Sequence, residues 1–265
     1  MCGFRADEPA AASPSEPDAL ARRVPRAGYL VLLLDYDGTL VPFARTPELA
    51  PPDSALRELL RALGARPRTT VHIVTGRSRE VAEAWLGEFG FWLHAEHGLW
   101  SRAPGASCWR SVEVPRATWR GEARRILDEF VARTPGSMVE EKSVALAWHY
   151  RMADPALGDA MARALSRALR ERLEGQPAEV LAGAKVIEVR PRGIHKGRVV
   201  PLALAQAPPA SMLIAVGDDR TDEDLFAALP ANALAIGVGP DVRSAAFRLA
   251  DVSAVRAFLA ALLSR

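Results

Sequence analysis

The strongest constraint on the fold is the apolar run GYLVLLL (28–34), which passes without a break into DYDGTL (35–40). The run is too short to span a membrane, and its continuous apolar character is typical of a strand buried on both faces of a parallel sheet. Two carboxylates, a glycine and a hydroxyl follow directly. In open parallel sheets ligands bind beyond the carboxyl ends of the strands, so we expect a functional site here.

Strand-like and helical patterns alternate on both sides of this run. Such alternation predicts an α/β fold, a doubly wound parallel sheet covered by helices. The expected strands are 28–34, 69–74, 91–98, 212–216 and 233–237, and the expected helices are 53–63, 78–88, 196–206, 221–228, 241–248 and 253–263.

The middle of the chain has a different pattern. Between 143 and 151 large apolar residues alternate with small or polar ones, as in a half-buried antiparallel strand. Further strands are expected at 137–142, 178–182 and 185–190, with helices at 116–133 and 155–173. We therefore predict a small α+β domain at 111–190, inserted into a core made of 26–110 and 191–265.

Composition excludes several classes of protein. The first 25 residues are rich in Ala, Pro and acidic residues, lack the apolar centre of a secretory signal and are expected to form a disordered tail. With only Cys2 and Cys108, a disulfide framework is not expected. The formal net charge is +2, and there is no basic run. We expect a cytoplasmic monomer that binds neither nucleic acid nor membrane.

Polar side chains gather at the predicted strand ends and at one helix start. Asp35 and Asp37 follow the first strand, Thr75 and Gly76 follow the second, and PRGIHKG (191–197) places Lys196 at the start of a helix. The strand at 212–216 leads into an acidic run that contains Asp218, Asp219, Asp222, Glu223 and Asp224. The sequence therefore predicts one site at this edge of the sheet.

Carboxylates that converge from different strands repel one another. A hard divalent cation removes that repulsion, and ligation by oxygen alone suits Mg²⁺. We therefore predict a Mg²⁺ site formed by Asp35, Asp37, Asp218 and Asp222. Asp222 would serve equally well to cap the helix at 221–228, so its role stays open.

Phosphate is the natural companion of protein-bound Mg²⁺. Backbone N–H groups around Gly38 and Gly76, the Thr75 hydroxyl and the Lys196 ammonium would form an anion cradle. Only three of the 34 basic residues are lysines, which draws attention to Lys196.

The two carboxylates of DYD then suit different steps of phosphoryl transfer. Asp35 is placed as a nucleophile that forms an aspartyl-phosphate. Asp37 is placed to protonate the leaving oxygen and later to activate water.

These motifs resemble the four motifs of the haloacid dehalogenase superfamily of aspartate-nucleophile phosphatases, in the same order. The resemblance covers about 25–265 and implies that the middle section is a cap of the C2B type. Within the superfamily the chain is similar to the trehalose-6-phosphate phosphatases, which implies Mg²⁺-dependent hydrolysis of trehalose 6-phosphate in trehalose biosynthesis. The supporting segments are TGR (75–77), AEHG (95–98), VEEKSVALAWHYR (139–151), VIEVRPRGIHKG (186–197) and GDDRTDE (217–223).

The same resemblance implies that cap residues Glu140, Lys142, Arg151 and Glu188 bind the sugar. From residue chemistry alone, Glu140 and Lys142 are neighbours on one face of a strand and would be only a surface ion pair. Arg77 would contact the phosphate or the sugar. The role of His97 in AEHG, in the core or in the site, stays open.

One position departs from the family pattern. A lysine that often precedes the cap glutamate by four positions falls on Ala184 here, and Lys185 is adjacent. A shift of one strand position turns a side chain to the other face. Either Lys185 faces outward and that contact is missing, or a bulge restores it.

Other functions share these motifs. The nearest is another capped sugar-phosphate phosphatase, for sucrose phosphate or mannosylphosphoglycerate, followed by a phosphomutase. A non-catalytic sugar-phosphate sensor is a different class, and it would not need a nucleophile.

Overall fold

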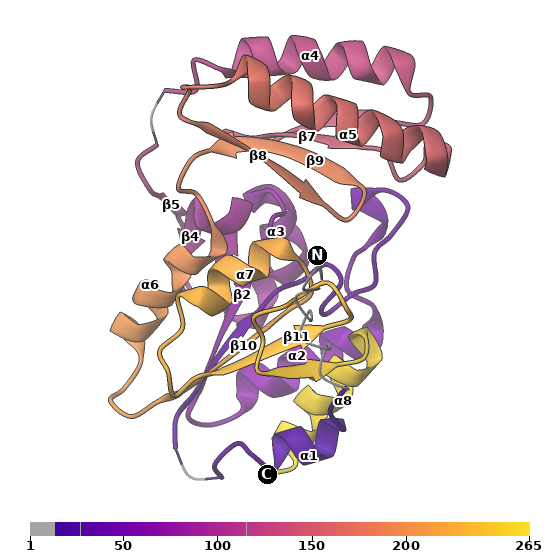
Figure 1. Ribbon diagram of the computed structural model, residues 1–265. Coiled ribbons are helices and arrows are strands. Elements are labelled where there is room, and N and C mark those ends of the chain that lie inside the picture. Colours follow the sequence, from indigo (N-terminus) through magenta and orange to yellow (C-terminus); the bar gives the residue numbers. More distant parts are fainter. Residues whose placement is uncertain (1–13, 27, 115) are drawn as a thin grey trace, which may run out of the picture.

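The apolar run lies at the centre of an eight-stranded sheet in the computed structural model, which describes residues 14–26, 28–114 and 116–265 (Figure 1). Six neighbouring strands are parallel, and two short antiparallel strands, which the sequence did not predict, extend one edge. In spatial order the strands are β12 (Phe247–Leu249), β11 (Leu234–Val238), β10 (Met212–Gly217), β1 (Leu30–Leu34), β2 (Thr69–Val74), β3 (Trp92–Ala95), β4 (Trp100–Arg102) and β5 (Arg110–Ser111).

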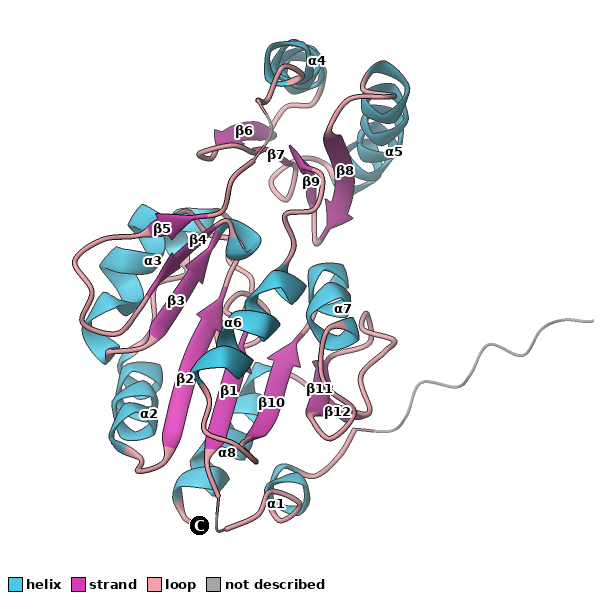
Figure 2. Ribbon diagram, turned by 90° about the vertical axis from the view of Figure 1, so that its left-hand side faces the viewer, coloured by secondary structure: helices cyan, strands magenta, loops and turns pink. Residues whose placement is uncertain are grey.

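Both faces of this larger sheet are covered by helices, as Figure 2 shows. Leu30, Leu32 and Leu34 of β1 pack into one apolar cluster, and Val31 and Leu33 pack into another on the opposite face. The first cluster lies under α1 (Pro17–Ala21), α2 (Ser54–Ala65), α3 (Arg79–Leu86) and α8 (Val252–Leu263), and the second lies under α6 (Val199–Gln206) and α7 (Arg220–Ala227). The predicted burial of β1 on both faces is confirmed.

Side-chain caps set where several helices begin. The carboxylate of Asp53 accepts the backbone N–H of Leu56 at 2.7 Å and starts α2, as the sequence predicts. Ser78, Asp154 and Asp251 cap α3, α5 (Pro155–Arg172) and α8 in the same way. Short 3₁₀ turns lie at η1 (Pro47–Leu49), η2 (Gly87–Phe89), η3 (Glu96–Gly98) and η4 (Lys196–Arg198).

A second, four-stranded antiparallel sheet lies beyond the carboxyl ends of the parallel strands (Figures 1 and 2). Its order is β6 (Met138–Glu141), β7 (Leu146–His149), β9 (Val186–Pro191) and β8 (Ala178–Gly183). Helices α4 (Arg120–Arg133) and α5 (Pro155–Arg172) pack on the face turned away from the larger sheet. The other face of this smaller sheet is therefore directed at the strand ends that carry Asp35 and Asp218.

Two expectations are wrong. The predicted disordered tail includes α1, where Leu20 and Ala21 are buried against α8 because these few apolar residues can join the core. Residues 1–13 of that tail lie outside the described residues. The predicted helix at 241–248 is instead a loop that leads into β12.

The loop is held by side chains rather than by helical hydrogen bonds. Glu223 accepts the backbone N–H groups of Arg243 and Ser244, and the Arg248 side chain donates to the carbonyls of Gly239 and Val242.

In the described part of the chain, no helix combines the length and the apolar character needed to cross a membrane.

Candidate active site

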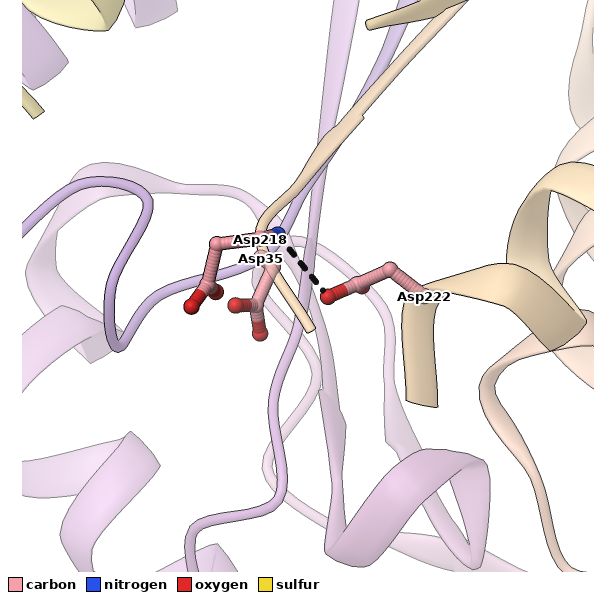
Figure 3. A group of neighbouring side chains, drawn as sticks. All are labelled: Asp35, Asp218 and Asp222. Atoms are coloured by element: carbon pink, nitrogen blue, oxygen red, sulfur yellow. Dashed lines mark hydrogen bonds between the residues drawn. The ribbon is translucent and has the colours of Figure 1, made fainter. Parts of the chain in front are cut away.

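Three carboxylates meet at the carboxyl ends of the central strands. Asp35 follows β1 and Asp218 follows β10, and these strands pair in parallel, so both side chains leave the same edge. Asp222, from the first turn of α7, completes the group (Figure 3). One oxygen from each lies within 4.8 Å of one oxygen from each of the others. We call these three residues the carboxylate cluster.

Lys196 supplies one positive charge to this cluster. Its ammonium donates to Asp35 at 2.7 Å and to Asp222 at 2.9 Å, and the side chain is buried. Burial disfavours the charged ammonium, but Asp222 and Asp35 outweigh it and hold the pKa of Lys196 well above its usual range. The hydroxyl of Thr39 lies 3.3 Å from Asp35 and 3.2 Å from Asp218.

A single ammonium does not balance three carboxylates. Burial, together with the charges of Asp35, Asp219 and Asp222, raises the pKa of Asp218 to about 10. Burial also raises the pKa of Asp35, against the opposing effect of Lys196. The group therefore favours a further cation, and its oxygen-only donors fit Mg²⁺.

Asp222 has a second role that limits its freedom. One of its oxygens accepts from Lys196, and the other accepts the backbone N–H groups of Asp218 at 3.1 Å and Asp219 at 3.2 Å. With Asp219 as N-cap this forms a capping box for α7. The capping alternative is confirmed, and the side chains most available to a metal are Asp35 and Asp218.

The side chain of Asp37 is not part of the carboxylate cluster, although the sequence predicts it as a metal ligand. Its carboxylate accepts two hydrogen bonds from the Arg77 guanidinium, one of them from Nε at 2.8 Å. Arg77 in turn lies over the Trp85 ring, 4.7 Å from its centroid. The reason is that the two carboxylates have different cationic partners. The Arg77 guanidinium binds both oxygens of Asp37 and draws it away from the cluster, whereas Lys196 holds Asp35 within it.

The predicted phosphate-binding glycines are required by close packing. Gly38 has φ +79°, and a Cβ there would collide with the Asp218 carboxylate. A Cβ on Gly76 would lie 2.6 Å from the His97 ring. The buried Thr75 hydroxyl accepts the backbone N–H of Arg77 at 3.1 Å, so it fixes the turn after β2.

A cleft of about 1030 Å³, open mouth included, lies between the two sheets. Asp35, Asp37, Gly76, Arg77 and Lys196 line it from the larger sheet. Glu140, Lys142 and Glu188, which we call the charged wall, line it from the smaller sheet. The predicted sugar residues thus line one cavity together with two of the predicted phosphate residues, Gly76 and Lys196. The other two, Gly38 and Thr75, are not part of its lining.

The charged wall is set by strand register. Glu140 on β6 and Glu188 on β9 both pair with Ala147 on β7, so the two carboxylates stand in one row with a small residue between them. Lys142 donates to Glu188 at 2.6 Å, and Glu140 pairs with His149 at 2.8 Å. The predicted ion pair between Glu140 and Lys142 is thus replaced by a buried pair between Lys142 and Glu188.

Charge pairing keeps the wall ionised. Burial favours a neutral Glu188, but Lys142 outweighs it and holds the pKa of Glu188 well below its usual range. Burial likewise opposes the charge of Lys142, and Glu188 with Glu140 raises its pKa.

The departure at Ala184 and Lys185 is resolved by the turn between β8 and β9. Lys185 has φ +62°, and its ammonium contacts Asp159 on α5 at 2.5 Å. Ala184 lines the cleft in its place. Lys185 therefore faces away from the site. Arg151 donates to the Ala184 carbonyl at 2.8 Å, and its guanidinium lies over the ring of Phe43, in the loop after β1 of the larger sheet.

His97 belongs to the site, which decides the alternative that the sequence left open. It and Glu96 are consecutive buried residues with φ of +59° and +47°. Both reach the smaller sheet: Glu96 accepts from the Ser143 hydroxyl at 2.5 Å, and His97 Nε2 lies 3.2 Å from Glu188 Oε1. The signal available in the sequence was the pair Glu96 and His97, two ionisable residues directly before Gly98 at the end of a predicted strand.

Sequence reasoning assigned no site role to Thr39, Asp219 and Phe43. Thr39 and Asp219 lie inside motifs that were recognised, DGT and GDD, so their positions were available. Phe43 lies in an irregular loop with no local signal of its role.

Comparisons with known proteins agree with this geometry. A family model described as trehalose-phosphatase matches residues 33–254. The chain is 40% identical over 242 residues to the bifunctional trehalose-6-phosphate synthase/phosphatase of Thermoproteus tenax, covering 91% of this chain and 33% of that protein. It is 38% identical over 213 residues to the trehalose-phosphatase of Schizosaccharomyces pombe, covering 78% and 26%. The chain thus spans only about a quarter to a third of the length of these relatives.

Solved structures show the same likeness. The C-terminal domain of C. albicans trehalose-6-phosphate phosphatase matches with a TM-score of 0.88 and 29% identity, over 97% of this chain and 99% of that one. A haloacid dehalogenase-like hydrolase from Bacteroides thetaiotaomicron, 15% identical with a TM-score of 0.58 over 85% and 95% of the two chains, shares the fold. The chain belongs to the trehalose-phosphatase family and has the haloacid dehalogenase-like fold.

Proposed function

We propose that the protein is a Mg²⁺-dependent phosphatase that hydrolyses trehalose 6-phosphate to trehalose and phosphate. One observation carries the proposal: Asp35 is buried at the end of β1, held by Lys196, beside Asp218 and beneath a cleft. The family match and the trehalose-phosphatases among the relatives support the choice of substrate.

Asp35 is the nucleophile. Lys196 and Thr39 fix its carboxylate, and one of its oxygens forms a bond to phosphorus while the bond from phosphorus to the sugar oxygen breaks. The product of this step is an aspartyl-phosphate on Asp35. Mg²⁺, held by Asp35 and Asp218, supplies positive charge to the phosphate oxygens when it is bound.

Asp37 moves the protons of both steps. It gives a proton to the departing sugar oxygen, and it later takes one from the water that attacks the aspartyl-phosphate. Arg77 holds its carboxylate at the cleft, two positions along the chain from the nucleophile. Arg77 must release Asp37 before the carboxylate can reach the leaving oxygen.

The smaller sheet, with residues 111–190, is the cap, and the charged wall binds the sugar hydroxyls. Glu188 is suited to this because it lines the cleft, with Oε2 held by Lys142 at 2.6 Å and Oε1 3.2 Å from His97 Nε2. An ionised carboxylate has about four acceptor sites, so these two partners leave capacity for a sugar hydroxyl. Closure of the cap would exclude water during the first step.

The test is phosphate release from a panel of sugar phosphates, with Mg²⁺ and with a chelator. We expect trehalose 6-phosphate to be the preferred substrate and chelation to abolish turnover. Asp35→Asn should lower phosphate release by at least about a thousandfold, because the amide is a poor nucleophile. Asp128→Asn, which changes an exposed aspartate of α4, is the matched control and should retain activity. Turnover that survives in Asp35→Asn would remove Asp35 as nucleophile.

A further inference from the structure

Exposed apolar side chains gather at the mouth of the cleft. Among the residues that the structure describes, five large apolar side chains are exposed, and three of these line the cleft. They are Phe43, Met138 and Met152, with 43%, 38% and 44% of their surface accessible. We call these three residues the apolar rim. Exposed apolar groups that cluster at a cavity mark a binding surface rather than a normal scattering.

The rim is assembled from segments that are distant in sequence. Phe43 lies in the loop after β1, on the side of the larger sheet, whereas Met138 opens β6 and Met152 follows β7 on the smaller sheet. Their convergence on one cavity is a product of the tertiary fold. None of the three contributes to an apolar core cluster, so packing of the core does not account for them.

Strand register places the rim next to one end of the charged wall. Met138, Glu140 and Lys142 are alternate residues on one face of β6, and the ladder continues to Lys142 through its backbone hydrogen bond to Ala145. At about 3.4 Å per residue, Met138 lies roughly 7 Å from Glu140 and roughly 13–14 Å from Lys142 along the strand. The row from Met138 to Lys142 is longer than one sugar ring and suits two linked rings.

The Phe43 ring is held in place across the mouth. The Arg151 guanidinium stacks on it from the smaller sheet, 5.0 Å from the ring centroid, and is itself held by the Ala184 carbonyl. Arg151 thus covers one face of the ring and favours one orientation of it. An oriented aromatic ring next to two adaptable thioethers is a surface that suits the C–H face of a pyranose.

We propose that the apolar rim is the subsite for the sugar ring that carries no phosphate, and that it selects disaccharide phosphates over monosaccharide phosphates. This inference rests on the proposed function. The phosphate is fixed near Asp35 and Lys196, and the charged wall serves hydroxyl groups, so the apolar face of the second ring is the part of the substrate that remains without a partner. The rim supplies that partner at the mouth.

The experiment compares kcat/KM for trehalose 6-phosphate with kcat/KM for glucose 6-phosphate, which has the same reacting group and lacks the second ring. Phe43→Ala should lower the ratio of the two by roughly tenfold, and Met138→Ala by less. Phe43→Trp, which keeps an aromatic face, should restore the ratio. Leu204→Ala is the matched control, since Leu204 is equally exposed at 42% and lies on α6 away from the cleft.

A second readout does not depend on turnover. Binding of trehalose itself, measured by calorimetry, should weaken about tenfold in Phe43→Ala and stay unchanged in Leu204→Ala. An unchanged ratio and unchanged trehalose affinity in Phe43→Ala would overturn the subsite while leaving the phosphatase intact. A wild-type protein that releases no phosphate from trehalose 6-phosphate would overturn the proposed function and the subsite with it.

Discussion

On the floor of the cleft the functional side chains leave the backbone at the ends of adjacent parallel strands, whereas on its roof they project from the open face of an antiparallel sheet. Asp35 and Asp218 are neighbours because β1 and β10 are paired, and glycines such as Gly38 let the carboxylates approach. Glu140 and Glu188 are neighbours because both strands flank Ala147. The floor is thus positioned by strand ends and tight turns, and the roof by register. Substitutions in the floor should therefore affect the chemical step, and substitutions in the roof should affect recognition of the sugar.

The largest expected effect is on the floor. Lys196→Met leaves Asp35 and Asp222 buried without their cation, so phosphate release should fall about 10²–10³-fold. The free energy of unfolding should fall by about 3 kcal/mol. Phosphate assays and urea unfolding measure the two effects. Lys142→Met is the matched variant on the roof, since it also removes a buried lysine that pairs with a carboxylate. If both variants lost only affinity for the sugar, the distinction between floor and roof would fail.

A smaller effect is expected on the roof. Glu188→Gln removes the negative charge that pairs with Lys142 and replaces one of the two accepting oxygens by an amide NH₂, which only donates. We expect kcat/KM for trehalose 6-phosphate to fall about 10–100-fold, mostly through KM. Glu141→Gln is the control, because Glu141 lies on the same strand and pairs outward with Arg120 and Arg124. A fall in kcat with KM unchanged would place Glu188 in the chemical step instead.

The pH dependence of the unfolding free energy is a further test of the roof, through the ionised Glu188. The folded-state pKa of Glu188 is well below its usual value, so its contribution to stability is fully present above the unfolded pKa of about 4.3. That contribution should be lost as pH falls from there toward the folded pKa. The wild type should therefore exceed Glu188→Gln in unfolding free energy at pH 6–7, by about 1–3 kcal/mol, and the difference should shrink at acid pH. A difference that grows on acidification would contradict the assigned direction.

The smallest effect tests the outward direction of Lys185. Its pair with Asp159 is exposed, so Lys185→Met should cost less than about 1 kcal/mol of stability. Hydrolysis of trehalose 6-phosphate should stay within about twofold of wild type, because the side chain does not line the cleft. A marked rise in KM would show that this lysine reaches the substrate when the cleft is filled.

The sequence predicts the floor better than the roof for a physical reason. Asp35, Gly38 and Lys196 lie in short motifs next to a strand or helix end, so local pattern and position coincide. The pair between Lys142 and Glu188 joins residues 46 apart, and the contact between Arg151 and Phe43 joins the side of the smaller sheet to that of the larger sheet. No local pattern contains such pairings.

Two predictions for the larger sheet differ from the structure, the place of Asp37 in the carboxylate cluster and the helix at 241–248, and both differences have the same origin. Arg77 and Asp37 are 40 residues apart, and their hydrogen bonds remove Asp37 from the carboxylate cluster. The loop before β12 has a helical pattern, yet Glu223 and Arg248 bind its backbone and exclude the helix. Tertiary hydrogen bonds decided both outcomes.

The turn at Glu96 and His97 bears on how the protein would release the product of the proposed reaction. Two successive residues other than glycine hold left-handed backbone angles, at a conformational cost of about 1–3 kcal/mol each. Their side chains touch Ser143 and Glu188, so separating the sheets would break both contacts and allow the backbone to relax. The two residues thus hold conformational strain while the sheets are in contact. Relief of that strain on opening would offset part of the energy of the contacts that are lost when the product leaves.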